Sequence, residues 1–122
     1  MVDSKLAGDI GGEVVVRRAQ DMLGYSLQAT DGEVGFVGDL VIDPEHFKLR
    51  YLVIDTGRWL SGRRVVLATP WISSVHPERK TVVVNIEKKR IADSPTYDQS
   101  VFDRNYERAL HEHYGFPYVS PF

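Results

Sequence analysis

The sequence predicts a mainly β fold: a small antiparallel β-barrel of five to six strands, followed by a C-terminal α-helix. Most of the 122 residues form short segments in which apolar and polar side chains alternate, which is the period of a half-buried strand. Tight-turn signals such as Asp31-Gly32 and Asp43-Pro44 separate these segments. From residue 99 onward the pattern changes to helical spacing. Short strands joined by tight turns are typical of a barrel or a sandwich.

The first hairpin is expected at Asp31-Gly32, between strands over residues 25–30 and 33–43. This dipeptide favours a tight hairpin because the central residues of such a turn adopt positive φ. Gly35 and Gly38 lie inside the second strand, where a bulge or a sharp bend would curl the sheet.

Further strands are expected over residues 49–55, 63–68, 71–75 and 81–86, and one helical turn over residues 19–24. Strands that bury one face place alternate residues in the interior. The predicted core is therefore Val34, Phe36, Leu40, Ile42, Leu52, Ile54, Val65, Leu67, Ile72, Val75, Val82, Val84 and Ile86.

The C-terminal segment has the signals of an amphipathic helix. Ser100, with Asp103 three residues later, has the spacing of a capping box, and Gly115 followed by Pro117 ends the pattern. One stripe of the helix holds Phe102, Tyr106, Ala109, Leu110 and His113. This stripe must dock on its own barrel or on that of a second copy.

Three parts follow from these elements: a flexible N-terminus over residues 1–12, a barrel domain over residues 13–98, and a helix with an aromatic tail over residues 99–122. The chain has no cysteine, which excludes disulfides and thiolate metal sites and is compatible with a reducing cytoplasm. Its apolar runs are far shorter than the roughly 20 residues of a membrane helix. We therefore expect a soluble, cytoplasmic protein that does not insert into a membrane.

The charges are distributed unevenly along the chain. Residues 46–90 contain ten Lys and Arg against three acidic residues, a net of +7, whereas the remainder carries five against fourteen, a net of −9. Such asymmetry can mark a site for an anionic partner, or acidic ends that lie over a basic middle. We favour the intramolecular interpretation because the basic residues alternate with core positions.

Several motifs, in order, resemble one known family: DGEVGFVGDLVID, RYLVIDTG, WLSGRRVVLATPWISSV, TVVVNI and IADSPTYD. They resemble the PRC-barrel family, a small β-barrel first recognised in the photosynthetic reaction-centre H subunit, and cover about residues 19–98. The trailing YERALHEHYGFPYV is similar to the helix and aromatic tail of free-standing bacterial members. The resemblance implies an adaptor or assembly role and not catalysis. Relatives include the cytoplasmic domain of the H subunit and the C-terminal domain of ribosome-maturation factors.

Asp55 suggests an enzymatic alternative. With Thr56 and Gly57 it matches the apolar-Asp-Thr-Gly signature of retroviral-type aspartic proteases, in which two subunits each contribute a carboxylate. Here Arg58-Trp59 follows at once, and no flap pattern comes after it. We therefore expect Asp55 to cap the turn through side-chain to backbone hydrogen bonds.

The histidines do not predict a metal site, and no cofactor is expected. His111 and His113 are two residues apart on the helix, so they point to different sides, whereas chelation from one helix needs a spacing of three or four. Glu107 and His111 have that spacing, but two ligands are too few for zinc. A hydrogen bond at the helix surface is the expected role of this pair.

The expected function is a non-catalytic protein-interaction or assembly module that forms a homodimer with itself. Trp, Tyr and Arg contribute most of the energy of interfaces. The interface candidates are Tyr51, Arg58, Trp59, Leu60, Arg63, Phe102, Tyr106 and Leu110. The alternative is an RNA- or ribosome-associated module that binds phosphates through the basic middle segment, with Trp59 or Tyr51 as a stacking platform.

Overall fold

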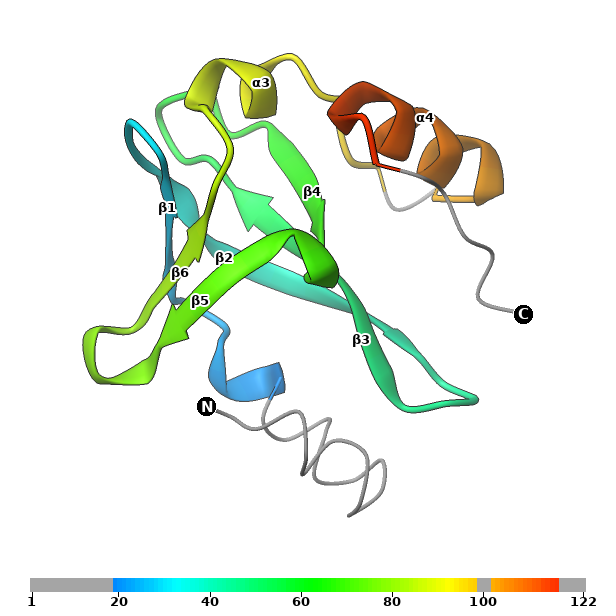
Figure 1. The fold of residues 1–122 in the computed structure, drawn as a ribbon, viewed down its shortest axis with the longest axis horizontal. Helices are drawn as coiled ribbons and strands as arrows, with labels where there is room; N and C mark the ends of the chain where they lie inside the picture. The colour runs from blue at the N-terminus through cyan, green and yellow to red at the C-terminus, as the bar shows by residue number, and fades with distance from the viewer. Residues whose placement is uncertain (1–18, 99–101, 117–122) are drawn as a thin grey trace.

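The computed structural model describes residues 19–98 and 102–116, and shows one six-stranded sheet curled into a half-barrel, with a helix at its C-terminal end (Figure 1). The expected flexible segment 1–12 lies outside the described residues. The strands are β1 (Ser26–Ala29), β2 (Gly32–Asp43), β3 (Lys48–Asp55), β4 (Arg64–Ala68), β5 (Ile72–His76) and β6 (Thr81–Val84). The helices are η1 (Thr69–Trp71), η2 (Pro77–Arg79), α3 (Lys88–Ala92) and α4 (Arg104–Tyr114).

The strand order is β4-β3-β2-β1-β6-β5, and consecutive strands in this order are antiparallel with one exception. β1 and β6 are parallel, with Ser26 opposite Thr81, and the two hydroxyl oxygens of this pair are 3.3 Å apart. The sheet is thus antiparallel, as predicted, except at this one junction. The chain returns there from the far edge of the sheet and places the β5–β6 hairpin beside the start of the barrel.

β2 carries two bulges, and the first of them explains why Phe36 is not in the core. Leu27 pairs with Gly35 and Gln28 pairs with Glu33, so Val34 is the extra residue on β2. A bulge inserts one residue and reverses the alternation of faces beyond it. Val37 is consequently buried, whereas Phe36 is 43% exposed. The prediction of Phe36 as a core residue is wrong, although the bulges do lie next to the glycines that predicted them.

Gly35 allows β2 to cross very close to the end of β3. A Cβ atom at this position would lie 2.1 Å from the carbonyl oxygen of Asp55 and 2.9 Å from Cα of Thr56. Since backbone atoms cannot move away as a flexible side chain can, the residue at this crossing must be glycine. The close approach is what bends β2 around the core.

β3 and β4 are buried on both faces. The inner face holds Leu52 and Ile54 on β3, with Leu67 and Val65 opposite them, as predicted. Alternation places the next residues of both strands on the outer face, and these are buried as well: Tyr51, Val53, Val66 and Ala68. α4 and the segment before it cover the outer face, and the helix residue Leu110 has no exposed surface within the single chain. The helix therefore docks on its own barrel.

The rest of the predicted core is largely interior. Val34, Val82, Val84 and Ile86 are buried. The remaining members are only half-buried, namely Leu40, Ile42, Ile72 and Val75. Ile91 of α3, which was not predicted as a helix, adds a fully buried side chain at the end of the half-barrel.

α4 begins one turn later than the capping-box prediction. Asp103 is the N-cap, and its side chain accepts a hydrogen bond from the backbone N–H of Tyr106, whereas Ser100 lies outside the described residues. Gly115 ends the helix as predicted, with φ of +77°, and its N–H donates to the carbonyl of Glu112. The buried stripe includes Tyr114 in place of Ala109, which is exposed. None of the helices within the described ranges has the length and apolar character needed to span a membrane.

Candidate functional site

A groove of about 310 Å³ opens where β3, η1 and the C-terminal end of α4 meet. It is lined by Arg50, Tyr51, Ala68, Pro70, Trp71, His111 and Phe116. Four of these side chains are aromatic rings and one carries a fixed positive charge. The lining therefore suits an apolar or aromatic group that has an acidic neighbour.

The barrel side of the groove follows from the local sequence. Tyr51 and Ala68 are paired across β3 and β4, so a large and a small side chain share one position on the outer face. Thr69 and Pro70 then form the 3-10 turn η1, which the hydroxyl of Thr69 ties to β3 by donating to the carbonyl of Leu49 at 2.8 Å. The turn places Trp71, which is 8% exposed, beside Tyr51 and under the end of α4.

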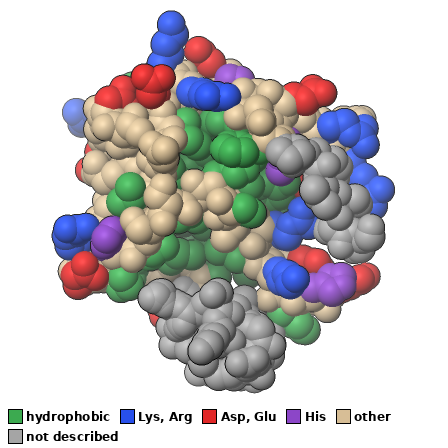
Figure 2. Space-filling model, viewed as in Figure 1, with side chains coloured by type: hydrophobic (Ala, Val, Ile, Leu, Met, Phe, Trp, Pro, Cys, Tyr) green, Lys and Arg blue, Asp and Glu red, His purple; other side chains and the backbone are tan. Residues whose placement is uncertain are grey.

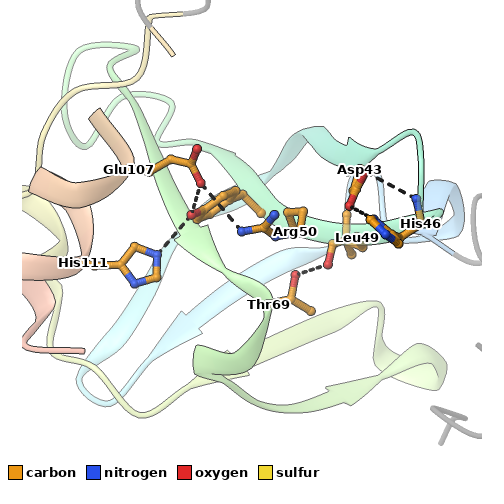
Figure 3. A network of polar contacts seen from close by, with 8 residues as sticks. Asp43, His46, Leu49, Arg50, Thr69, Glu107 and His111 are labelled. Atoms are coloured by element: carbon orange, nitrogen blue, oxygen red, sulfur yellow. Dashed lines mark hydrogen bonds and ion pairs between the residues drawn. The ribbon is translucent and has the colours of Figure 1, made fainter. Parts of the chain in front are cut away.

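Tyr51 connects the barrel to α4 through a polar network (Figure 3). Its hydroxyl donates to Glu107 Oε1 at 2.7 Å and lies 3.1 Å from His111 Nε2. Since the single hydroxyl proton goes to Glu107, the Nε2–H of His111 donates to the tyrosine oxygen. Arg50 Nη2 is 3.7 Å from the same Glu107 oxygen, and its guanidinium carbon is 5.6 Å from the centre of the Tyr51 ring. The four-residue spacing of Glu107 and His111 therefore directs both side chains at one barrel residue.

Trp71 is the centre of an aromatic cluster at the other end of the groove. Its ring centroid lies 5.0 Å from that of His111, 4.8 Å from that of Tyr114 and 5.2 Å from that of Phe116. The planes of Trp71 and Phe116 differ by only 22°, so these two rings are stacked. Phe116 is 42% exposed, and Figure 2 shows hydrophobic side chains gathered in the middle of this face, between the β5–β6 hairpin and α4.

A second, smaller groove of about 200 Å³ lies on the other side of Phe116. Its lining is more polar and consists of Thr30, Asn85, Ile86, Glu87, Arg90, Tyr114 and Phe116. Arg90 donates to the backbone carbonyl of Tyr114 at 2.7 Å, which fixes the end of α4 to α3. Phe116 thus stands as a ridge between two grooves.

Two tyrosines of α4 are held neutral by burial. Burial raises the pKa of Tyr114 to about 12, and it also raises the pKa of Tyr106 well above the ordinary value. The hydroxyl of Tyr106 donates to the carbonyl of Pro95 at 3.0 Å. Both rings are therefore uncharged parts of the packing at any physiological pH.

The structure places several of the interface candidates inside the chain. Tyr51 and Leu110 are buried, with 2% and 0% exposed, so neither ring nor side chain is available to a partner. Phe102 and Tyr106 are half-buried. The ring centroid of Phe102 lies 5.5 Å from that of Tyr51 and 5.8 Å from that of Tyr97. All four belong to one contact, in which the apolar side of α4 and the residues just before it pack against the barrel of the same chain.

The loop around Trp59 also turns back on the chain. Trp59 and Leu60 pack against the core, and Lys88 Nζ lies 4.9 Å from the centre of the Trp59 ring. Arg63 donates to the backbone carbonyls of Ala92 and Ser94 and so clamps the segment between α3 and α4. These side chains are used within the chain.

The two remaining predicted residues are arranged differently. Arg58 is exposed beside this loop. Asp55 Oδ1 accepts a hydrogen bond from the N–H of Gly57 at 2.8 Å, where Gly57 has φ of +58°. That bond is the geometry that the turn-capping hypothesis requires.

Sequence reasoning missed most of the groove. Trp71 was expected to begin a strand, and Phe116 was part of an aromatic tail with no assigned place. The sequence feature that pointed to the groove was the four-residue spacing of Glu107 and His111, which places both side chains on one face of the helix. Within the described ranges, no three His, Asp or Glu side chains gather in a way that could hold a metal ion.

The comparison with protein families agrees with the architecture. Residues 15–91 match the PRC-barrel domain. The chain belongs to the PRC-barrel domain family. Among curated proteins, no relative matches it. The family match ends before α4, so the groove joins two parts of the chain: β3 and η1 come from the PRC-barrel, whereas His111 and Phe116 come from the C-terminal extension.

Proposed function

We propose that this PRC-barrel protein is a non-catalytic interaction module that associates with itself through the aromatic groove. One observation carries the proposal: the C-terminal extension completes a groove on the barrel and leaves Phe116 exposed at its rim, stacked on Trp71. An aromatic side chain that is 42% exposed above an apolar groove is characteristic of a contact surface.

The composition of the groove supports protein binding. Trp71 and Arg50 belong to the residue types that dominate interface energy, and the turn that carries Trp71 is fixed to β3 by the hydrogen bond from Thr69 to Leu49. A rigid surface loses little side-chain entropy when a partner binds. The groove is therefore preorganised for a contact.

The chemistry of the polar groups supports a structural use of them. Glu107 and His111 share the Tyr51 hydroxyl, Asp55 holds its own turn, and Arg63 holds the segment before α4. Each of these groups could take part in catalysis elsewhere, but here each is aimed at a neighbour in the same chain. This pattern favours a binding module over a protease.

Several side chains of the basic middle segment contact groups of the same chain. Arg50 faces Glu107, Arg63 binds backbone carbonyls, Lys88 lies over Trp59, and Arg90 binds the end of α4. These contacts support the intramolecular interpretation of the charge asymmetry. They also weaken the case for an extended phosphate-binding surface.

The test is sedimentation of the full chain over a range of concentrations. We expect a dimer whose dissociation constant rises at least about tenfold in Phe116→Ser, as for an interface hot spot. Phe36→Ser is the matched control, because Phe36 is equally exposed, at 43%, but does not line the groove. A monomer at every concentration would refute self-association, and salt-sensitive binding of RNA would favour the alternative function.

A further inference from the structure

The turn between β2 and β3 is held rigidly by Asp43. One carboxylate oxygen of Asp43 accepts from the N–H groups of Glu45 and His46, at 2.9 and 3.4 Å. The other lies 2.7 Å from His46 Nδ1, and the Asp43 side chain is only 7% exposed. The hairpin extends away from the body of the half-barrel (Figure 1). Its tip is therefore a preorganised projection.

Phe47 occupies an unfavourable position on this tip. Its φ is +51°, in the left-handed region that is unfavourable for a residue with a Cβ and that Gly and Asn adopt more readily. Its ring is 47% exposed and is the most exposed large hydrophobic side chain in the described residues. A turn that needed only its backbone shape would be better served by Gly or Asn. Backbone strain combined with an exposed aromatic ring points to a use outside the chain.

We propose that Phe47 of one copy inserts into the aromatic groove of a second copy, and that the second copy does the same in return. This inference rests on the proposed self-association and names the contact that produces it. The groove has a volume of about 310 Å³, and an apolar cavity of roughly 150 Å³ already accommodates benzene. A phenyl ring therefore fits in the groove beside the stacked pair of Trp71 and Phe116, where it meets aromatic faces and edges.

The charges beside the ring and beside the groove are complementary. Glu45, two residues before Phe47, is exposed on the tip. Arg50 lines the groove, and its side chain keeps 23% of its surface exposed next to Glu107. With Phe47 inserted, the Glu45 carboxylate approaches the Arg50 guanidinium of the other copy. An opposite pair at the rim would orient the contact more than strengthen it.

The positions of tip and groove allow both contacts to form at once. Phe47 is the last residue of the turn before β3, and Arg50 and Tyr51 follow three and four residues later, so the groove begins about 10 Å from the tip along one hairpin. Figure 3 shows the two ends of this stretch, with His46 at the turn and Glu107 and His111 at the groove. Two hairpins laid antiparallel about a two-fold axis would bring each tip to the other groove. Such a contact closes on itself and gives a dimer.

The decisive variant is Phe47→Asn, because asparagine accepts the left-handed conformation. We expect its melting temperature to equal or exceed that of the wild type at concentrations at which both are monomeric, whereas its dimer dissociation constant rises at least about tenfold. Phe36→Asn makes the same change at an equally exposed site outside the groove, and should leave dimerisation unchanged. A wild-type dimer that Phe47→Asn does not weaken would overturn the insertion.

A mixing experiment tests the pairing directly. Phe47→Asn lacks the inserting Phe47 ring but keeps an intact groove. Phe116→Ser keeps the Phe47 ring but has a damaged groove. Their heterodimer retains one intact contact, so an equimolar mixture should associate more tightly than either variant alone. No gain on mixing would overturn the reciprocal contact. If Phe116→Ser weakens the dimer and Phe47→Asn does not, only the insertion fails, whereas a wild-type monomer refutes the proposed self-association as well.

Discussion

The hydroxyl of Tyr51 donates to Glu107 Oε1 at 2.7 Å and thereby links a buried residue of the sheet to the helix that covers it. Glu107 is only 12% exposed on its side chain, and Arg50 is its second neighbour, at 3.7 Å. A carboxylate so placed depends on its hydrogen bonds, because leaving it unpaired costs desolvation energy without compensation.

Tyr51→Phe should therefore lower the free energy of unfolding by about 1–3 kcal/mol while the fold is kept. The substitution keeps the ring packing against Phe102 and removes only the hydroxyl. Chemical denaturation measures the loss, and a double-mutant cycle with Glu107→Gln should give a coupling energy between the two sites. Additive effects of the two substitutions would contradict a direct interaction.

Gly35 and Gly38 provide a matched pair in β2. We expect Gly35→Ala to cost more than about 2 kcal/mol, because its Cβ would overlap the carbonyl oxygen of Asp55. Gly38→Ala should change stability by less than about 1 kcal/mol, because the nearest atom is the Asp55 Cβ, at 3.4 Å. Thermal unfolding of both variants measures the difference, and equal stability would contradict the close crossing of β2 and β3.

The inner face of the sheet could be predicted from the sequence because it depends on local alternation. Leu52, Ile54, Val65 and Leu67 are buried where a period of two places them. Phe36 was assigned to the wrong face since a single bulged residue inverts the alternation, and the size of a bulge is decided by the partner strand.

The outer layer and the groove could not be predicted in the same way. Val53 and Val66 are buried on the outer face, beside Tyr51, which contacts α4. The docking position of that helix is set by contacts between distant segments. Trp71 and Phe116 stack although 45 positions separate them in the sequence. The local sequence around each residue predicts its secondary structure, but the two residues form one site only through tertiary packing.

The Asp43 and His46 pair predicts a specific dependence of stability on pH. The hydrogen bond from the His46 side chain, helped by two backbone N–H groups, lowers the pKa of Asp43 from the ordinary 3.8. Between the folded and the unfolded pKa values, the unfolded state binds more protons, so stability rises with pH. The contribution is complete above about pH 5 and is lost as the pH falls through the lowered value.

Asp43→Asn should therefore be less stable than the wild type at neutral pH, and the gap should close in acid below the ordinary pKa of 3.8. Denaturation curves collected from pH 2 to pH 7 measure this gap. His46→Ala should raise the pH at which acid unfolding begins. A gap that stays constant over the whole range would show that Asp43 acts through geometry alone.

Asp55 separates the binding function from the protease alternative. If its carboxylate only holds the Gly57 N–H, Asp55→Asn should keep the fold and lose about 1 kcal/mol, comparable with the loss of a helix cap. Unfolding of the variant measures this loss. Acid-dependent peptide cleavage by the wild type that disappears in Asp55→Asn would instead support catalysis.

The docking of α4 on its own barrel depends on Leu110, which has no exposed surface. Leu110→Ala should cost about 2–5 kcal/mol, because it removes buried methyl groups and leaves a cavity between helix and sheet. Ala109→Ser, at the exposed neighbouring position, is the control and should stay within about 0.5 kcal/mol of the wild type. Truncation after Asp98 should have a larger effect than Leu110→Ala, because it also removes the contacts of Tyr51 with Phe102, Glu107 and His111. Thermal unfolding with sedimentation distinguishes the outcomes: loss of stability follows from docking within the chain, whereas unchanged melting of the truncated protein would show that the barrel does not need the helix.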